Sequence, residues 1–484
     1  MKTLWLHVGT PKTGTSSIQQ FCFENWGVLR KLGFAFLKVP FRYQHLPQSQ
    51  NGHFLYLEPR PSESSESAAA RRDKTERGYA QLERAFTQRD NVVCSDELLW
   101  AVCGKSDSLT VRTLKEHSVE HGYTVKIIVY LRRQDLLAES WYNQRVQQGI
   151  KGKDSRRWGR WLSGQVRESF DYAGVLDGVA SVFGADNITV RVYDRSALEA
   201  AGGLEADFLS CLGLSIDEGF IPLAHESNSK RLAPNFLEIK RIVNGSPNKT
   251  FENGHLFRRA ADICSAEVSD EPHWRLFSAE EARAFLAQFE EGNARVAREY
   301  LHTDAPLFDM TVGDVRKWTI ANKWMVGDII RYFQCVNRLQ DERADAEARG
   351  AEAGAAQQAA KGAKGAKGAG TEARKADVGD AQQGAKGAAP DIDRRLARAA
   401  WREPIVRNTR RHAIRVLAEY FLLRDDDMRA GREVGHADDA AVEALVRTVL
   451  AESRHMVELQ EKTGEPGPRT FAGRVSRKLR RACR

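Results

Sequence analysis

The sequence predicts an α/β protein with a central parallel sheet over residues 1–345. Short runs of β-branched and aromatic residues alternate there with longer amphipathic stretches, which is the pattern of βαβ units. From about residue 346 to 392 the composition changes to Ala, Gly, Lys, Gln and Glu, which cannot bury a core. We therefore expect one sheet domain, a flexible linker over 346–392, a small helical region over 393–466 and a basic tail over 467–484.

Length and composition agree with a globular protein of more than one unit. The chain has 484 residues, of which 42% are apolar and 29% charged. The net charge of +8 favours anionic ligands without choosing among them. The first eight residues are too short for a signal peptide and no run of about 18 apolar residues occurs, so we expect a cytoplasmic protein.

Four β-rich runs are the expected strands, and amphipathic segments follow them. The strands are predicted at Thr3–Val8, Asn91–Ser95, Val125–Leu131 and Asn187–Tyr193. Apolar residues from Ile18 to Leu29 lie at helical spacing, and a further helix is expected after Asp135, a suitable N-cap. Ser278–Leu301 also has the pattern of a helix.

The first predicted strand continues into Gly9-Thr10-Pro11-Lys12-Thr13-Gly14-Thr15-Ser16-Ser17 and then a helix. Strand, Gly-containing turn and helix N-terminus together direct backbone N–H groups at an anion, and Lys12 and the hydroxyls add donors. We therefore expect a three-layer P-loop NTPase-like fold. A nucleotide P-loop places lysine directly after its second glycine. Thr15 holds that position here, which counts against ATP or GTP with magnesium.

Pro-Lys-Thr-Gly-Thr-Ser-Ser resembles the 5′-phosphosulfate loop of sulfotransferases that use 3′-phosphoadenosine 5′-phosphosulfate (PAPS). A second motif supports this resemblance, because in that family a strand ends in arginine and a serine eight residues later joins it at the 3′-phosphate. Arg132 and Ser140 have this spacing. The segments Ile188–Tyr193, Asn228–Arg231 and Phe285–Leu301 resemble the bacterial carbohydrate-type branch of the family.

The resemblance implies a set of residues that bind the donor without a metal. At the 5′-phosphosulfate these are Lys12, Thr13, Gly14, Thr15, Ser16 and Ser17; at the 3′-phosphate they are Arg132 and Ser140. The chain lacks the Arg-Lys-Gly-x-x-Gly segment of the cytosolic small-molecule enzymes. Arg231 is the candidate that closes the nucleotide site in its place, and a surface arginine is an equally good interpretation.

The implied reaction is sulfuryl transfer to a hydroxyl of a saccharide or glycan. Lys12 and the loop N–H groups would neutralise charge on the bridging oxygen. Two residues are candidates for the general base. Glu97 follows the strand Asn91–Ser95, where ligands bind in α/β sheets, whereas His53 resembles a Gly-His element of some glycan sulfotransferases and has the better intrinsic pKa. Topology favours Glu97 slightly.

Weaker signals leave alternatives open. His117 and His121 have the spacing of a metal-binding pair, but no third ligand is evident, so a solvated face is favoured and no metal is expected. The basic segment Lys151–Trp161 suits an anionic glycan, and equally an exposed turn whose tryptophans pack inward. The basic tail could contact an anionic membrane surface. No nucleic-acid partner is expected.

Two other functions compete with sulfuryl transfer. The first is a nucleotide-dependent kinase with a degenerate phosphate loop, which would need magnesium and would turn over ATP. The second is a non-catalytic polyanion-binding protein that uses the basic surface and tail. Its binding would be salt-sensitive and would survive replacement of Lys12.

Overall fold

A computed structural model describes residues 1–349 apart from 45, 59–62, 106, 150–155, 165–168, 217–218, 224–230, 246–250, 269–273, 314, 321, 323, 326, 330, 337, 341, 344 and 347–348. The chain forms two compact units. The first contains Met1–Tyr142, Trp158–Ser229 and Arg275–Lys317, and the second contains the remaining stretches. The described residues stop at 349. The helical region, the basic tail and all but the start of the linker therefore lie outside them.

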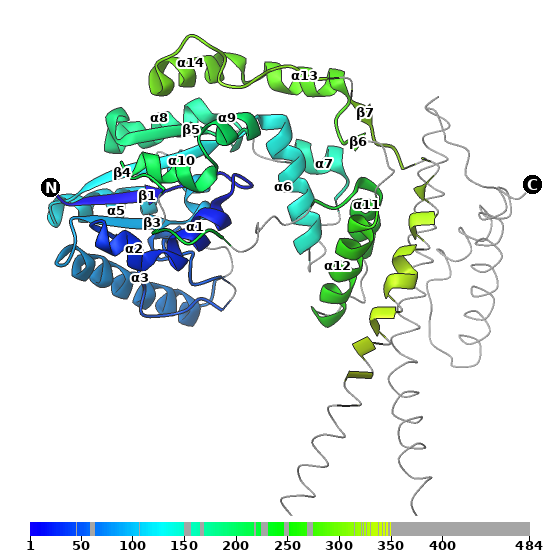
Figure 1. The fold of residues 1–484 in the computed structure, drawn as a ribbon, viewed down its shortest axis with the longest axis horizontal. Helices are drawn as coiled ribbons and strands as arrows, with labels where there is room; N and C mark the ends of the chain where they lie inside the picture. The colour runs from blue at the N-terminus through cyan, green and yellow to red at the C-terminus, as the bar shows by residue number, and fades with distance from the viewer. Residues whose placement is uncertain are drawn as a thin grey trace, which may run out of the picture. The chain divides into compact units, whose positions relative to one another are not determined.

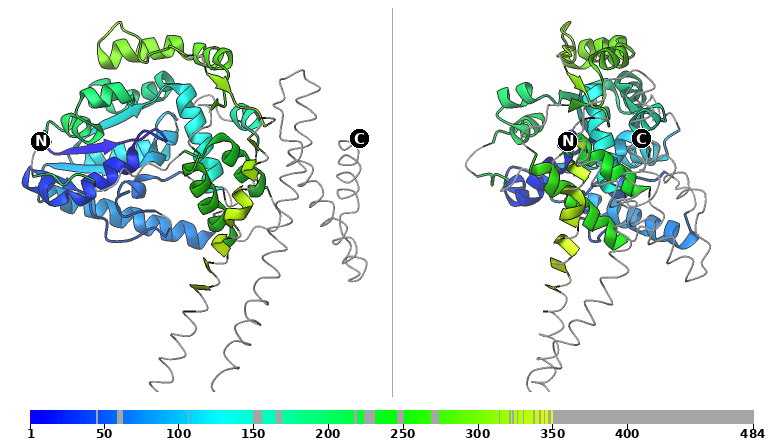
Figure 2. Two further views of the ribbon diagram at one scale, coloured as in Figure 1. Left: turned by 45° about the vertical axis from the view of Figure 1, so that its right-hand side comes forward. Right: turned by 90° about the vertical axis from the view of Figure 1, so that its right-hand side faces the viewer.

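The first unit is built on a five-stranded sheet in which all neighbouring strands are parallel. In spatial order the strands are β2 (Phe34–Phe36), β3 (Asn91–Ser95), β1 (Thr3–His7), β4 (Thr124–Leu131) and β5 (Ile188–Val192). The sheet is visible at the centre of this unit in Figure 1 and from two other sides in Figure 2.

The register brings the ends of the three middle strands close to one another. At its carboxyl end, His7 of β1 pairs with Ser95 of β3 and with Ile128 of β4. Strand β4 continues past this level to Leu131. Segments that follow β1, β3 and β4 therefore gather at one edge of the sheet, where open α/β sheets bind ligands.

Helices cover both faces of the sheet. One face carries α3 (Ser65–Phe86), α5 (Leu109–Glu120) and α8 (Tyr172–Phe183), and the other carries α1 (Thr15–Glu24), α2 (Trp26–Lys31) and α10 (Leu204–Cys211). Strand side chains alternate between the two cores: Val92 and Cys94 face the first, and Val93 faces the second. This confirms the predicted three-layer α/β fold.

The remaining elements of the first unit connect or flank these layers. They are α4 (Trp100–Cys103), α6 (Gln134–Gln148), α7 (Trp158–Ser163), α9 (Arg195–Ala200), α13 (Ala279–Ala287), α14 (Glu290–Leu301), β6 (Trp274–Arg275), β7 (Arg316–Lys317) and the short 3₁₀ helices η1 (His53–Leu55), η2 (Glu97–Leu99) and η5 (Ala185–Asn187). The boundary between the units crosses α6 and β6, after Tyr142 and Trp274.

Two predicted helices differ from those observed. Ser278 begins the expected helix with a capping box to Glu281, but Gln288 and Phe289 interrupt it, giving α13 and α14. Asp135 does not cap α6 and lies in its first turn. There it accepts hydrogen bonds from Arg133 and Arg275, at 2.8 and 3.0 Å, which explains why an acid occupies this position.

The second unit contains α11 (Pro234–Asn244), α12 (Phe251–Ala266) and helical turns after Trp318. Buried amides hold it together: Asn235 Nδ2 donates to Asp328 Oδ2 at 2.8 Å, and its Oδ1 accepts from Trp318 Nε1 at 2.7 Å. Arg231 lies here, exposed, shortly before α11. Within the described residues, none of the helices combines the length and apolar character required to cross a membrane.

Candidate active site

The loop between β1 and α1 is tied to the neighbouring strand β4. Thr10 Oγ1 donates to the carbonyl oxygen of Tyr130 at 2.8 Å, and Val8 N–H donates to that of Ile128 at 2.9 Å. Thr13 Oγ1 donates to the carbonyl oxygen of Thr10 at 2.7 Å, inside the loop. These bonds fix the loop shape, so the Thr13 hydroxyl proton is already used.

Two residues of the loop have left-handed backbone conformations. Lys12 has φ 65°, and Gly14, the N-cap of α1, has φ 75°. Glycine adopts this conformation readily, whereas for lysine it costs on the order of 1–3 kcal/mol. Such strain concentrates at functional sites, which agrees with the role predicted for Lys12.

Thr15 provides a buried hydroxyl beside Gly9. A Cβ atom on Gly9 would lie 2.0 Å from Thr15 Oγ1, so only glycine fits against it. Thr15 Oγ1 is buried and has no hydrogen-bond partner among the residues that the structure describes. Buried polar groups normally have partners, so an oxyanion bound in the loop is a natural one. Ser16 is exposed and Ser17 half-buried at the start of the same helix.

Arg132 extends from the end of β4 to the loop. Its Nη1 donates to the carbonyl oxygen of Lys12 at 3.1 Å, and its guanidinium lies 5.7 Å from the ring centroid of Tyr193, just beyond β5. Tyr172 OH donates to the Arg132 carbonyl oxygen. The fold thus brings together the two predicted motifs. Ser140 lies half-buried on α6, and its role stays a prediction.

The charges of Lys12, Arg132 and Glu97 influence one another. Burial and then the positive charge of Arg132 lower the pKa of Lys12, and Glu97 partly opposes this. Burial raises the pKa of Glu97, Asp96 adds to the rise, and Lys12 opposes it. Glu97 is therefore placed beside the cationic loop, and its raised pKa is of the kind found at functional sites.

Asp96 connects β3 to the second candidate base. Its Oδ2 lies 3.0 Å from His53 Nδ1 and accepts from Gln50 Nε2 at 3.1 Å, while its Oδ1 accepts from Leu98 N–H at 2.7 Å. Asp96 is fully buried and His53 is 7% exposed. This pairing was not predicted, because the two residues are 43 positions apart; the acid directly after a predicted strand was the only signal in the sequence.

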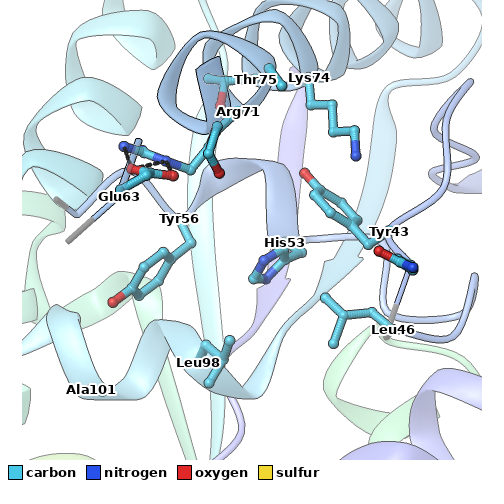
Figure 3. A pocket seen from close by; sticks show the side chains of 13 residues that line it. Tyr43, Leu46, His53, Tyr56, Glu63, Arg71, Lys74, Thr75, Leu98 and Ala101 are labelled. Carbon is cyan, nitrogen blue, oxygen red and sulfur yellow. Dashed lines mark hydrogen bonds and ion pairs between the residues drawn. The ribbon is translucent and has the colours of Figure 1, made fainter. Parts of the chain in front are cut away.

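A cavity of about 510 Å³ opens beside His53. Tyr43 meets the imidazole edge-on at 4.6 Å and Tyr56 is parallel to it at 6.1 Å, measured between ring centroids. Two cations of α3, Arg71 and Lys74, line the opposite side (Figure 3). Arg71 Nη2 pairs with Glu63 Oε2 at 2.9 Å, and Lys74 Nζ lies 4.7 Å from the Tyr43 centroid. The cavity thus combines aromatic faces, cations and a histidine.

The basic segment near α7 does not provide aromatic faces for a ligand. Trp161 is buried, and Trp158 packs partly buried against the core, with 4.9 Å between its ring centroid and that of Phe277. Of the two alternatives left open by the sequence, this packing favours the turn whose tryptophans pack inward. Residues 151–155 of this segment lie outside the described residues.

Comparisons with known proteins give limited similarity. No family model matches the chain. A segment of 185 residues is 31% identical to an uncharacterized protein of Archaeoglobus fulgidus; it spans 37% of this chain and 46% of that protein, less than half its length. A crystal structure of a sulfotransferase from Alicyclobacillus acidocaldarius is 16% identical, covers 53% of this chain and 99% of that one, and gives a TM-score of 0.30. At that TM-score the likeness adds nothing to a functional argument.

Proposed function

We propose that this protein is a sulfotransferase that moves a sulfuryl group from PAPS to a hydroxyl of a carbohydrate or glycan. The observation that carries the proposal is the hydrogen bond between Arg132 and the Lys12 carbonyl. It joins the two motifs of the family resemblance at adjacent strand ends. Glu97 follows β3, the strand on the other side of β1, and His53 contacts Asp96 at the end of that same strand.

The 5′-phosphosulfate and the 3′-phosphate of the donor would bind to the segments that follow β1 and β4. The 5′-phosphosulfate would take the loop N–H groups, Lys12 and the Thr15 hydroxyl, whose buried oxygen fits an anionic ligand. Ser16 and Ser17 would add donors at the start of α1. Arg132, with Ser140, would take the 3′-phosphate.

Lys12 would act on the charge that develops during transfer. The acceptor oxygen forms a bond to sulfur while the bond from sulfur to the bridging oxygen breaks, and adenosine 3′,5′-bisphosphate leaves with that electron pair. The Lys12 ammonium stabilises the growing negative charge on the bridging oxygen. Glu97, close enough to shift the pKa of Lys12, would help to keep this ammonium protonated.

His53 would accept the proton of the acceptor hydroxyl. It lines the cavity, and Asp96 holds its ring through Nδ1, as an orienting carboxylate does for a catalytic histidine. Glu97 remains the competing candidate for the base. His53→Gln and Glu97→Gln separate the two candidates. In a variant that still binds the donor normally, transfer should be lost only if the replaced residue is the base.

The cavity supports a saccharide acceptor. Tyrosine rings give flat faces to the C–H surface of a sugar. Lys74 suits an acidic group on it, whereas the charge of Arg71 is already paired with Glu63. The same features favour an anionic glycan over a neutral one.

Calorimetric titration with adenosine 3′,5′-bisphosphate tests the donor site without knowledge of the acceptor. Micromolar binding that Arg132→Ala removes, and that ATP with magnesium does not match, is the expected result. No binding, or a preference for ATP with magnesium, would overturn the proposal and favour a kinase or a non-catalytic polyanion-binding protein.

A further inference from the structure

Three metal-ligating side chains converge far from the candidate active site. His117 lies in the last turn of α5 and His121 is its C-cap, so both precede β4. Glu83 lies in the last turn of α3, before β3. Since the sheet is parallel, this cluster sits at the amino ends of the strands, whereas the phosphate loop follows their carboxyl ends. The sequence offered no third ligand for the two histidines, and the fold supplies one from 34 residues earlier.

The ligand atoms of the three groups lie close together. Glu83 Oε1 lies 3.2 Å from His117 Nε2 and 3.8 Å from His121 Nε2, and the candidate ligand atoms all lie within 4.8 Å of one another. Tetrahedral zinc with bonds of about 2.0–2.1 Å places its ligand atoms about 3.3 Å apart. The first pair already has that spacing. The second needs a shift of about half an ångström, which a side chain 35% exposed can make.

The surroundings of His117 prepare it as a ligand. Tyr123 OH lies 2.9 Å from His117 Nδ1, and Tyr79 packs against the imidazole with 4.2 Å between ring centroids. The Tyr123 hydroxyl oxygen can accept a hydrogen bond from Nδ1–H, which leaves the Nε2 lone pair for a metal, and such outer partners orient metal-binding histidines.

The donor set selects the kind of ion. Two imidazole nitrogens and one carboxylate oxygen suit zinc and its neighbours among the transition metals, whereas magnesium and calcium prefer oxygen ligands. The two imidazoles stack with 4.1 Å between ring centroids, so the exposed His121 ring must turn out of the stack to bring both nitrogens onto one ion.

We propose that Glu83, His117 and His121 form a zinc site that joins the end of α3 to the end of α5, with water completing the coordination. Both helices cover the same face of the sheet. The bound ion would therefore act as a cross-link that stabilises this layer, separate from the proposed sulfuryl transfer.

Metal titration of the tag-free full chain, stripped with a chelator, tests the site. Zinc is added in competition with a chromophoric chelator, and cobalt is used to read d–d absorption in the visible range. We expect one equivalent to bind. Loss of a residue that hydrogen-bonds to a metal ligand typically costs about 10–100-fold in affinity, so Tyr123→Phe should weaken binding by that factor. His121→Gln removes a ligand itself and should weaken binding by more than about 100-fold.

Controls keep this test decisive. His302→Asn removes an exposed histidine that ends α14 and should bind zinc like the unchanged chain. Saturating zinc should raise the apparent Tm by about 5 °C at a hundred-fold excess over Kd, but not in His121→Gln. His121 is exposed at a helix end, so this variant should fold, as circular dichroism will verify. No zinc binding, or equal binding by His121→Gln, would overturn the proposal.

Discussion

Asp96 Oδ2 lies 3.0 Å from His53 Nδ1, although 43 residues separate the two in sequence. The contact depends on Gly52, whose N–H donates to the Ser95 carbonyl at 3.1 Å. A Cβ atom on Gly52 would lie 3.0 Å from the Ser95 carbonyl carbon, so glycine permits this close approach. The end of β3 thus fixes both the carboxylate and the segment that carries the imidazole.

Asp96→Asn should lower kcat by about 10²–10⁴-fold and leave the affinity for adenosine 3′,5′-bisphosphate unchanged. The amide retains an oxygen for the Leu98 N–H but offers His53 a neutral partner, which weakens its orientation and its protonated form. Steady-state rates and calorimetry on the same preparation measure the two effects. Asp194→Asn, which changes the exposed capping aspartate of α9, is the matched control and should be close to the unchanged enzyme. Full activity in Asp96→Asn would remove His53 from the mechanism and leave Glu97.

Arg132→Ala should weaken binding of adenosine 3′,5′-bisphosphate by about 10–100-fold, since a hydrogen bond to a charged group contributes about 1.5–3 kcal/mol. Arg133→Ala is the matched control. Arg133 donates to Asp135 at 2.8 Å and to the Asp309 carbonyl at 2.7 Å, so its loss should reduce stability and spare affinity. Calorimetry and urea unfolding give both quantities. If Arg133→Ala lost affinity and Arg132→Ala lost only stability, the phosphate contact would belong to Arg133.

Lys12→Met should reduce the rate of transfer by about 10²–10³-fold, because the methylene chain is kept and the charge at the bridging oxygen is lost. Lys12→Arg should restore only part of the rate, since a planar guanidinium does not replace a compact ammonium. Single-turnover measurements with saturating PAPS isolate this step. Equal rates for both variants and the unchanged enzyme would mean that Lys12 serves only to shape the loop.

The difference in the free energy of unfolding between Glu97→Gln and the unchanged protein should shift in favour of the variant as the pH rises. Burial raises the pKa of Glu97, so the folded state holds the carboxyl proton more tightly than the unfolded chain, whose pKa is about 4.3. The stability this provides exists below the unfolded pKa and is lost as the pH rises through the folded one. Glutamine cannot ionise, so the difference should grow in urea unfolding as the pH rises above the unfolded pKa.

Glu281→Gln provides the comparison of opposite sign. Burial alone would raise the pKa of Glu281, but hydrogen bonds from Lys317 and Ser278 hold it below its usual range. Its contribution is present above the unfolded pKa and is lost as the pH falls through the folded one. This variant should therefore be less stable than the unchanged protein at pH 7, and the difference should shrink in acid. The same trend in both variants would contradict the assigned environments.

Sequence patterns predicted the long strands of the sheet and missed the short strands β2, β6 and β7. Asn91–Ser95 was predicted to the residue, and the ends of β1, β4 and β5 were within one. Strand β2, Phe34–Phe36, has only three residues, too few for a periodic signal, and its pairing with β3 defines it. The division of Ser278–Leu301 depends on backbone geometry at Phe289, which periodicity does not record.

Site residues were predictable where a motif is continuous in sequence. The proximity of Lys12 and Arg132 could be predicted because each belongs to a motif that follows a strand, and parallel pairing brings those strand ends together. The contacts of Asp96 with His53, 43 positions away, and of Glu83 with His117, 34 positions away, were not predicted. Helix packing and strand order, which sequence patterns do not record, bring these residues together. Aspartate and glutamate are common on any solvated surface, so the residue type alone does not mark a site.

The division of the chain between its two units affects its synthesis. The second unit takes its first stretch from Asn143 and its last from Trp318 onward. At about 5–20 residues per second, a ribosome makes these two points about 10–35 s apart. Asn235 is synthesised within that interval, but its hydrogen-bond partners in the finished unit, Trp318 and Asp328, are synthesised only at its end. A nascent chain therefore carries unpaired amides and apolar helix faces until late in translation, which makes this unit the expected client of chaperones and the part most sensitive to premature termination.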